Sequence, residues 1–287
     1  MRNLLTRTFI GILFLAVVIG SFFLPHLCFY LLFTAFAIIG MYEYIAMMHK
    51  IGYKIQWLLP ILITLLLCST AFCFGRYADT GLNAGIWIRI EPRFIILPVL
   101  TFIAIWLIPI VELYRKQEQS TNIIATALWP LLWIAMPFAL VILWQSVSSG
   151  VVLAMLIIIW TYDTLAYCTG SLFGKHRLFE RISPKKSWEG LLVSLLLTSA
   201  IATLFYFIPY FQADKIFTTI WHWTGFAAII IVSATFGDLV ESMLKRGCQV
   251  KDSGYILPGH GGILDRFDSL LFAAPLGAVY YGFFSVV

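Results

Sequence analysis

Residues 150–169 read GVVLAMLIIIWTYDTLAYCT, and this stretch decides the class of fold. Its 20 residues contain a single charged side chain, Asp163. About 20 consecutive, predominantly apolar residues are what an α-helix needs to cross the hydrocarbon core of a bilayer. A helix is also able to satisfy its own backbone hydrogen bonds there. The stretch therefore predicts a membrane-spanning helix.

Comparable stretches recur along the chain of 287 residues, which is 61% hydrophobic and 11% charged. A soluble domain is nearer half apolar and a quarter charged, so a soluble enzyme, a disordered chain and a nucleic-acid-binding domain are excluded. We expect an all-α, polytopic integral membrane bundle of about nine transmembrane helices. The predicted spans are 8–25, 27–46, 57–74, 94–113, 123–145, 150–169, 190–210, 223–244 and 268–286.

The basic residues predict the orientation of these helices. With the N-terminus in the cytoplasm, only four of the 19 Lys and Arg residues fall on the outer side, and 15 fall on the cytoplasmic side. Such a bias is typical of cytoplasmic loops. The four outer residues are Arg76, Arg89, Arg93 and Lys215. We expect one continuous membrane domain, with helices facing lipid or a dimer partner in 1–120. Catalytic helices and the cytoplasmic loops 170–189 and 245–268 fall in 121–287.

Five acidic residues lie within or near the predicted spans, where a charge is costly and usually has a partner or a task. Glu43 and Glu112 lie near cytoplasmic helix ends, and Arg115 follows Glu112 by three positions. We expect both to be surface acids that snorkel or pair with a base. Asp163 either makes a polar contact between helices or has a functional role, and the polar loop that follows favours function. The remaining two are Asp238 and Glu241.

Asp238, Glu241 and Lys245 share one face of the eighth predicted span, at spacings of three and four residues. Two interpretations fit this pattern. The three side chains form a ladder of ion pairs that locks helices together, or they form a face that handles a metal or phosphate. Helix geometry alone does not choose between them.

The polar segment 242–268 reads SMLKRGCQVKDSGYILPGHGGILDRFD. Its glycine turn allows backbone N–H groups to approach an anion closely. Oxygen ligands beside cations suit a magnesium–phosphate site, because Mg²⁺ takes one or two carboxylates plus substrate phosphates. Asp265 also has a simpler explanation as an acid that complements the helix dipole, and His260 alone does not indicate a base. The candidate residues are Lys245, Arg246, Lys251, Asp252, His260, Asp265, Arg266 and Asp268.

The second polar segment, Ser183-Pro-Lys-Lys-Ser-Trp-Glu-Gly190, precedes the seventh predicted span. Ser187 is a suitable N-cap, with Glu189 in the first turn. Capping does not explain Lys185 and Lys186, which near a helix N-terminus suit a polyphosphate. The two segments together predict a membrane-embedded enzyme that acts on a phosphorylated substrate at the cytoplasmic face, with a divalent metal.

Segment 242–268 resembles the signature of the phosphatidate cytidylyltransferase (CDP-diacylglycerol synthase) family at every fixed position. The segments 163–174 and 183–190 are similar to weaker family blocks, whereas the first 120 residues match only in hydrophobicity and length. The resemblance implies the reaction of CTP with phosphatidate to give CDP-diacylglycerol and pyrophosphate. It also implies magnesium dependence, room for a second cation such as K⁺, a homodimer and a bacterial inner membrane.

Combining the resemblance with the residues gives predicted roles. Asp238, Asp265, Asp268 and Glu241 are expected to bind metal. The basic residues Lys245, Arg246, Lys251 and Arg266 are expected to contact phosphates of either substrate. His260 is expected to shape the phosphate turn, and Asp252 to assist the metal-binding acids. Asp163, Ser183, Lys185, Lys186, Ser187 and Glu189 are expected to hold CTP.

Other functions are compatible with parts of the pattern. A polyprenol or phytol kinase, or a synthase for another lipid phosphate, would also use CTP at a membrane. A transporter would explain intramembrane acids, but its polar residues usually lie near the bilayer midplane rather than at one helix end. A structural scaffold leaves the polar segment 242–268 unexplained.

Overall fold

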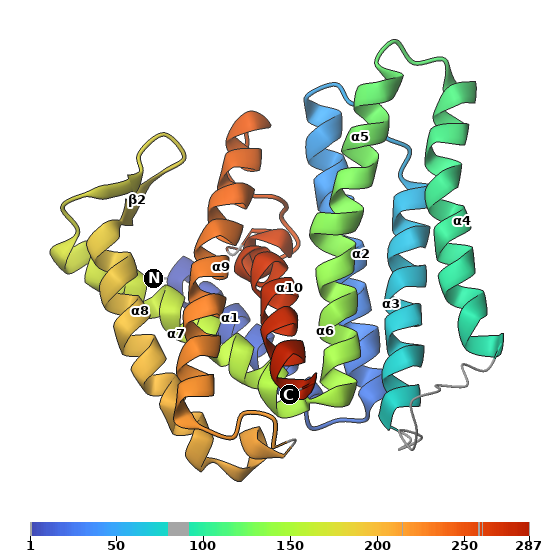
Figure 1. The fold of residues 1–287 in the computed structure, drawn as a ribbon. Helices are drawn as coiled ribbons and strands as arrows, with labels where there is room; N and C mark the ends of the chain where they lie inside the picture. Colours follow the sequence, from blue (N-terminus) through green and yellow to red (C-terminus); the bar gives the residue numbers. More distant parts are fainter. Residues whose placement is uncertain (1, 80–91, 214, 258, 260, 287) are drawn as a thin grey trace. The chain divides into compact units, whose positions relative to one another are not determined.

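A computed structural model describes residues 2–79, 92–213, 215–257, 259 and 261–286 (Figure 1). Its internal contacts divide the chain into two units. The first combines Met1–Val147 with Cys248–Arg266, and the second combines Ser148–Gly247 with Phe267–Val287. The proposed functional division near residue 120 remains a prediction.

The first unit consists of long apolar helices. They are α1 (Arg2–Ser21), α2 (His26–Lys50), α3 (Leu58–Asp79), α4 (Pro92–Arg115), α5 (Ser120–Pro130) and α6 (Met136–Val147). A π-helical segment, η1 (Leu131–Ala135), joins α5 to α6, so that Ser120–Val147 forms one apolar span. Pro130 and Pro137 lie on either side of η1 and have no N–H to donate, and a π segment accommodates such interruptions without ending the helix.

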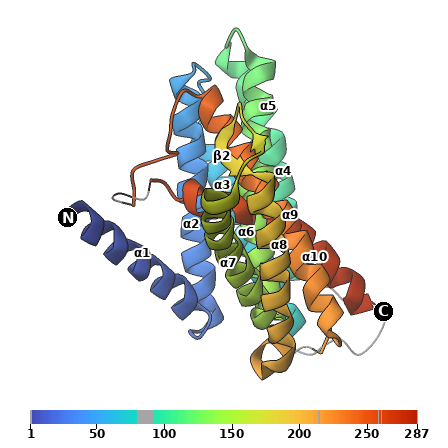
Figure 2. The same cartoon turned by 90° about the vertical axis from the view of Figure 1, so that its left-hand side faces the viewer.

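Aromatic side chains fill the centre of this unit. The α3 helix packs along α4 and α6, and α2 contacts α3 and α6 (Figure 1). The rings of Phe29 and Phe33 stack with centroids 4.1 Å apart, and Phe138 of α6 lies edge-on to Phe33. The α1 helix contacts α2 through the rings of Phe14 and Phe36, and the two helices diverge at an angle (Figure 2). This packing fixes α2, which carries Glu43.

The second unit contains four α-helices and a small hairpin. Its elements are α7 (Ser149–Phe173), β1 (Arg177–Phe179), β2 (Ser183–Ser187), α8 (Trp188–Ala202), η2 (Thr203–Phe207), η3 (Pro209–Gln212), α9 (Ile220–Gly247) and α10 (Leu264–Val286), whose first residues belong to the first unit. The α8 helix packs along α7 and α9. Buried Trp223 lies at the centre of an aromatic cluster that includes Phe205 and Phe217.

The hairpin was not predicted, because segment 171–189 was interpreted only as a polar loop. Strands β1 and β2 are antiparallel, with Arg177 opposite Ser187 and Phe179 opposite Ser183. At its end Ser187 caps α8 as predicted, accepting a hydrogen bond from the Gly190 N–H at 3.2 Å. The hairpin thus leads directly into a capped helix and places its lysines beside that helix.

The helical membrane architecture is confirmed. All nine predicted spans lie on helices, and within the described residues eight helices are long and apolar enough to cross a bilayer. The first predicted span is the exception in length, because the described apolar part of α1 is the shorter Thr8–Ser21. The orientation of the helices remains a prediction.

Candidate active site

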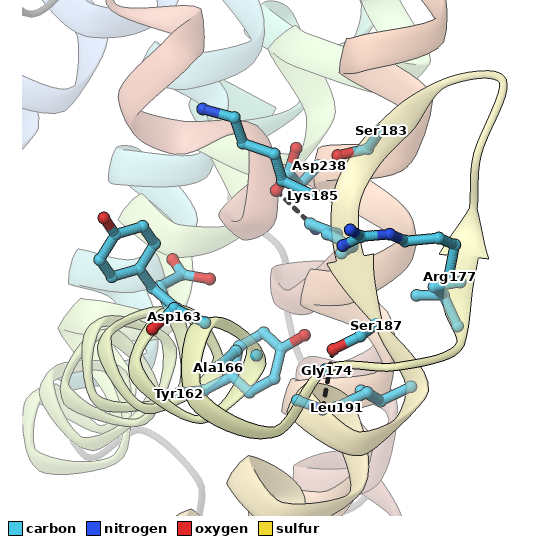
Figure 3. A pocket seen from close by; sticks show the side chains of 16 residues that line it. Tyr162, Asp163, Ala166, Gly174, Arg177, Ser183, Lys185, Ser187, Leu191 and Asp238 are labelled. Carbon is cyan, nitrogen blue, oxygen red and sulfur yellow. Dashed lines mark hydrogen bonds and ion pairs between the residues drawn. The ribbon is translucent and has the colours of Figure 1, made fainter.

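A cavity of about 590 Å³ lies in the second unit, between α7, the hairpin, α8 and α9. Figure 3 shows side chains entering it from α7, from the hairpin and from α9. Its volume falls in the range of small-molecule sites, roughly 300–1,000 Å³. Residues predicted separately for nucleotide and metal line this one cavity: Asp163, Ser183, Lys185, Lys186, Ser187 and Asp238.

Lys186 and Asp238 form the polar centre of the cavity. The Lys186 Nζ lies 2.5 Å from Asp238 Oδ2, and Ser242 donates from Oγ to Asp238 Oδ1 at 3.1 Å. Burial alone would lower the pKa of Lys186, but the charge and hydrogen bond of Asp238 outweigh it, so the pKa is raised above its ordinary value. Lys186 is therefore an ammonium at neutral pH, held in place by an acid on α9.

Two further carboxylates, Asp163 and Asp268, interact electrostatically within this neighbourhood. Asp268 of α10 interacts electrostatically with Asp238, Asp163 and Lys245. The helices α9 and α10 are close enough that a Cβ at Gly237 would lie 2.5 Å from the Asp268 carbonyl oxygen. Acidic side chains therefore lie close to lysine ammonium groups in this unit. This is the arrangement expected of a site for a metal-bound polyphosphate.

The residues fit a magnesium ion that is completed by substrate. Within the described part of the chain, no three His, Cys, Asp or Glu side chains are grouped so that they hold a metal by themselves. Mg²⁺ does not need such a group, because it commonly takes one or two carboxylates and keeps water or phosphate oxygens. Asp238 and Asp268 meet this requirement.

Glu241 has a different environment from its neighbour Asp238. Its side chain is fully buried and pairs with Lys245, one helical turn later. Of the two interpretations of the face formed by Asp238, Glu241 and Lys245, the ion pair describes Glu241 and Lys245. Asp238, by contrast, lines the cavity. The predicted metal-binding role of Glu241 remains untested.

In the first unit, residues at the two ends of the glycine turn, residues 253–262, donate hydrogen bonds to Asp265. The Asp265 Oδ2 accepts hydrogen bonds from Ser253 N at 2.9 Å, Ser253 Oγ at 3.0 Å and Gly262 N at 2.8 Å. Asp265 lies in the first turn of α10, where an acid also complements the helix dipole. A metal would therefore meet a carboxylate whose orientation the turn has already fixed.

The other residues of the polar segment have less restricted surroundings. Arg246, Lys251, Asp252 and Arg266 are exposed to solvent. His260, which was predicted to shape the phosphate turn, lies outside the described residues. Glu189 Oε2 accepts hydrogen bonds from the backbone N–H groups of Lys175 and His176, both at 3.1 Å. Its Oε1 lies 2.5 Å from His176 Nδ1. It thus fastens the start of the hairpin to α8.

The expectation for Glu43 was wrong, whereas that for Glu112 was right in part. Glu43 is 3% exposed and accepts hydrogen bonds from the polar segment, so it is not a surface acid. Glu112 pairs with Arg115 at 2.5 Å as expected, but it is also buried. Each acid is compensated by partners that come from the ends of helices or the loops between them.

A model of the cytidylyltransferase family matches residues 5–284. The chain belongs to this family. A phosphatidate cytidylyltransferase of Rickettsia bellii is 30% identical over 212 residues, covering 68% of this chain and 90% of the relative. One from Rickettsia typhi is 38% identical over 157 residues, covering 52% and 65%. One from Staphylococcus aureus is 41% identical over 136 residues, covering 46% and 50%.

This cytidylyltransferase also contains candidate site residues that sequence reasoning missed. Arg177 and Tyr162 line the cavity, and the Tyr162 hydroxyl lies 2.6 Å from Thr235 Oγ1. Arg177 carried a detectable signal, because it is a base within the polar loop 171–189. For Tyr162, the only signal in the sequence was its position beside Asp163.

Proposed function

We propose that this chain transfers the cytidylyl group of CTP to phosphatidate, giving CDP-diacylglycerol and pyrophosphate. The observation that carries the proposal is the cavity that both hairpin lysines line and in which Lys186 pairs with Asp238 of α9. A cavity that combines ammonium groups with acids at a helix end suits a nucleoside triphosphate. Family membership and the names of the relatives support the same reaction.

The reaction forms one bond and breaks one. A phosphate oxygen of phosphatidate attacks the α-phosphorus of CTP, and the bond from that phosphorus to the oxygen bridging it to the β-phosphorus breaks. Pyrophosphate leaves with the electron pair. The nucleophile is already anionic, so no general base is required. Catalysis then consists of positioning and of neutralising charge during in-line displacement.

The cavity residues have distinct tasks in this proposal. Lys186, held by Asp238, neutralises a phosphate oxygen of CTP from a fixed position. Lys185 and Arg177 reach the same cavity from the hairpin and bind the outer phosphates. Ser183 and Ser187 orient CTP by hydrogen bonding, and Asp163 holds the nucleotide from α7. These contacts place the α-phosphorus for attack.

The polar segment supplies the remaining charges. Lys245, Arg246, Lys251 and Arg266 bind phosphates of either substrate, and Asp252 assists the metal-binding acids. Candidates to hold Mg²⁺ are Asp238 and Asp268 in the second unit and, separately, Asp265 in the first, with Glu241 as a further candidate and K⁺ as a second cation. When bound, the metal stabilises the charge that develops on the departing pyrophosphate.

The location of the reaction follows from its substrates. Phosphatidate is a membrane lipid and CTP is soluble, so the site has to lie at a membrane surface. The excess of Lys and Arg in the predicted cytoplasmic loops supports a site facing the cytoplasm of a bacterial inner membrane. We include a homodimer in the proposal because the family resemblance implies one.

Product analysis of the detergent-purified protein tests the proposal. The protein is mixed with CTP, phosphatidate and Mg²⁺, and CDP-diacylglycerol is measured by mass spectrometry together with released pyrophosphate. Formation of both products, dependent on both substrates and abolished by EDTA, is expected. Folded protein that makes neither product from several lipid phosphates would refute the proposal.

A further inference from the structure

Glu43 holds both ends of the glycine turn to α2. Its Oε2 accepts hydrogen bonds from Ser253 Oγ and Leu264 N, both at 3.0 Å, and its Oε1 accepts one from Ile263 N at 2.9 Å. Ser253 lies at the start of the turn, whereas Ile263 precedes α10 and Leu264 is its first residue. One carboxylate from 210 residues away in sequence therefore closes the loop and caps a helix.

Two glycines leave room for this carboxylate. A Cβ at Gly262 would lie 2.5 Å from each Glu43 oxygen, and a Cβ at Gly254 would also collide with Glu43. Gly262 N–H donates in turn to Asp265, and Ser253 contacts both acids. Glu43 and Asp265 thus bind the same turn, and the Ser253 hydroxyl lies 3.0 Å from an oxygen of each carboxylate.

We propose that Glu43 is a positioning residue for cytidylyl transfer, which sets the geometry of the turn that carries Asp265. The inference rests on the proposed function for its meaning, but the contacts that carry it are independent of substrate. Glu43 does not itself touch the reacting groups. It acts by fixing Ser253 and the start of α10, which fix the Asp265 carboxylate.

The arrangement requires a carboxylate and not merely a polar side chain of the same size. Two oxygens accept from three donors, and two of these donors are backbone N–H groups that face neighbouring oxygens. A glutamine has one acceptor oxygen, so in either orientation its NH₂ group would face a backbone N–H, that of Ile263 or that of Leu264. Glu43→Gln therefore loses at least one hydrogen bond and leaves a buried donor unsatisfied.

The expected kinetic effect is a loss of turnover with little effect on CTP binding. A misplacement of about 1 Å in a catalytic group costs about a hundredfold in rate. We expect kcat to fall by about ten- to hundredfold in Glu43→Gln. The KM for CTP should change by less than about threefold, because the cavity in the second unit keeps its residues. Glu43→Asp keeps the charge on a shorter side chain, so its kcat should lie between those of Glu43→Gln and wild type.

Cys248 provides a readout that does not depend on activity. It is 4% exposed, belongs to the same unit as Glu43, and interacts with Lys50 and Tyr44 of α2. Burial raises the pKa of its thiol, with Lys50 opposing the effect, so its reaction with maleimide is slow while the segment stays packed. The experiment uses a background in which Cys28, Cys68, Cys73 and Cys168 are replaced by alanine.

Glu112 is the matched control, because it is another buried acid of the first unit whose partner is Arg115. Glu43→Gln should raise the labelling rate of Cys248 by about ten- to hundredfold. An increase of this size corresponds to the loss of one or two hydrogen bonds to a charged acceptor. Glu112→Gln should leave both Cys248 labelling and kcat near those of the parent. Size-exclusion profiles of each variant show whether it is folded.

The outcomes separate this inference from the proposed function. Inactive wild-type protein would refute the proposed function, and the labelling comparison would still test whether Glu43 holds the turn. Active wild type with unchanged kcat and protected Cys248 in folded Glu43→Gln would overturn the inference. If Glu43→Gln does not fold, Glu43→Asp takes its place, and wild-type kcat with protected Cys248 in that variant would also overturn it.

Discussion

Removal of the Lys186 ammonium should strongly reduce turnover with limited loss of stability. Lys186 lies 2.5 Å from Asp238, with side-chain exposures of 24% and 28%. Removing one partner of a pair this far from bulk water leaves the other charge partly desolvated, at a cost of about 1–3 kcal/mol. A group that also neutralises charge in the transition state contributes about 3 kcal/mol more to catalysis, which corresponds to about a hundredfold in rate.

A double-mutant cycle distinguishes pairing from catalysis. The variants are Lys186→Met, Asp238→Asn and the double substitution, each assayed for kcat/KM with CTP and for thermal unfolding in detergent. If Lys186 contacts CTP, Lys186→Met should reduce kcat/KM about a hundredfold. The double variant should then be less active than Asp238→Asn alone. Measurable and equal activity of the double variant and Asp238→Asn would show that Lys186 serves only to neutralise Asp238, and would refute the reasoning.

The pH profile adds a check with a defined sign. Because the pKa of Lys186 is raised by its neighbours, its charged form is favoured in the folded protein. The resulting stability is present below the unfolded pKa of lysine and is lost as the pH rises through the higher folded value. Activity should therefore show no loss from deprotonation of Lys186 between about pH 7 and pH 9. A Lys186-dependent fall in that interval would contradict the raised pKa.

Three further substitutions test other parts of the account. Asp268→Asn should abolish magnesium-dependent turnover in protein that remains folded, measured as pyrophosphate release across a Mg²⁺ titration; unchanged magnesium dependence would contradict its role. Ser187→Ala should lower the free energy of unfolding by about 1 kcal/mol through loss of the α8 cap, measured by thermal melting. A melting temperature equal to that of wild type would show that the Ser187 cap contributes no measurable stability. Gly262→Ala should cost about 1–3 kcal/mol because the new methyl group overlaps Glu43 and Ser253, and it should also reduce turnover. Full activity there would mean that the turn tolerates displacement.

Sequence reasoning succeeded where the signal is local. The apolar run at 150–169 and its counterparts predicted helices because the bilayer requires length and hydrophobicity, both of which are visible in a short window. The cap at Ser187 and the pairing of Glu112 with Arg115 depend on spacings of three residues. Such short spacings determine geometry on a helix without any knowledge of the tertiary structure.

It failed where the partner is remote or the local pattern is ambiguous. The three donors to Glu43 lie more than 200 residues further along the chain, so nothing beside Glu43 distinguishes it from a snorkelling surface acid. The contact between Lys186 and Asp238 likewise joins the hairpin to α9. The hairpin itself consists of strands of three and five residues, which are too short for an alternating pattern to stand out.

Following the α-phosphate of CTP tests the central claim most directly. The purified protein is given phosphatidate, Mg²⁺ and CTP labelled with radioactive phosphorus at either the α- or the γ-position, and the lipid is extracted. Cytidylyl transfer predicts that the α-label enters the lipid while the γ-label leaves as pyrophosphate. Appearance of the γ-label in lipid, with the α-label retained in soluble CDP, would contradict the account and identify a CTP-dependent lipid kinase.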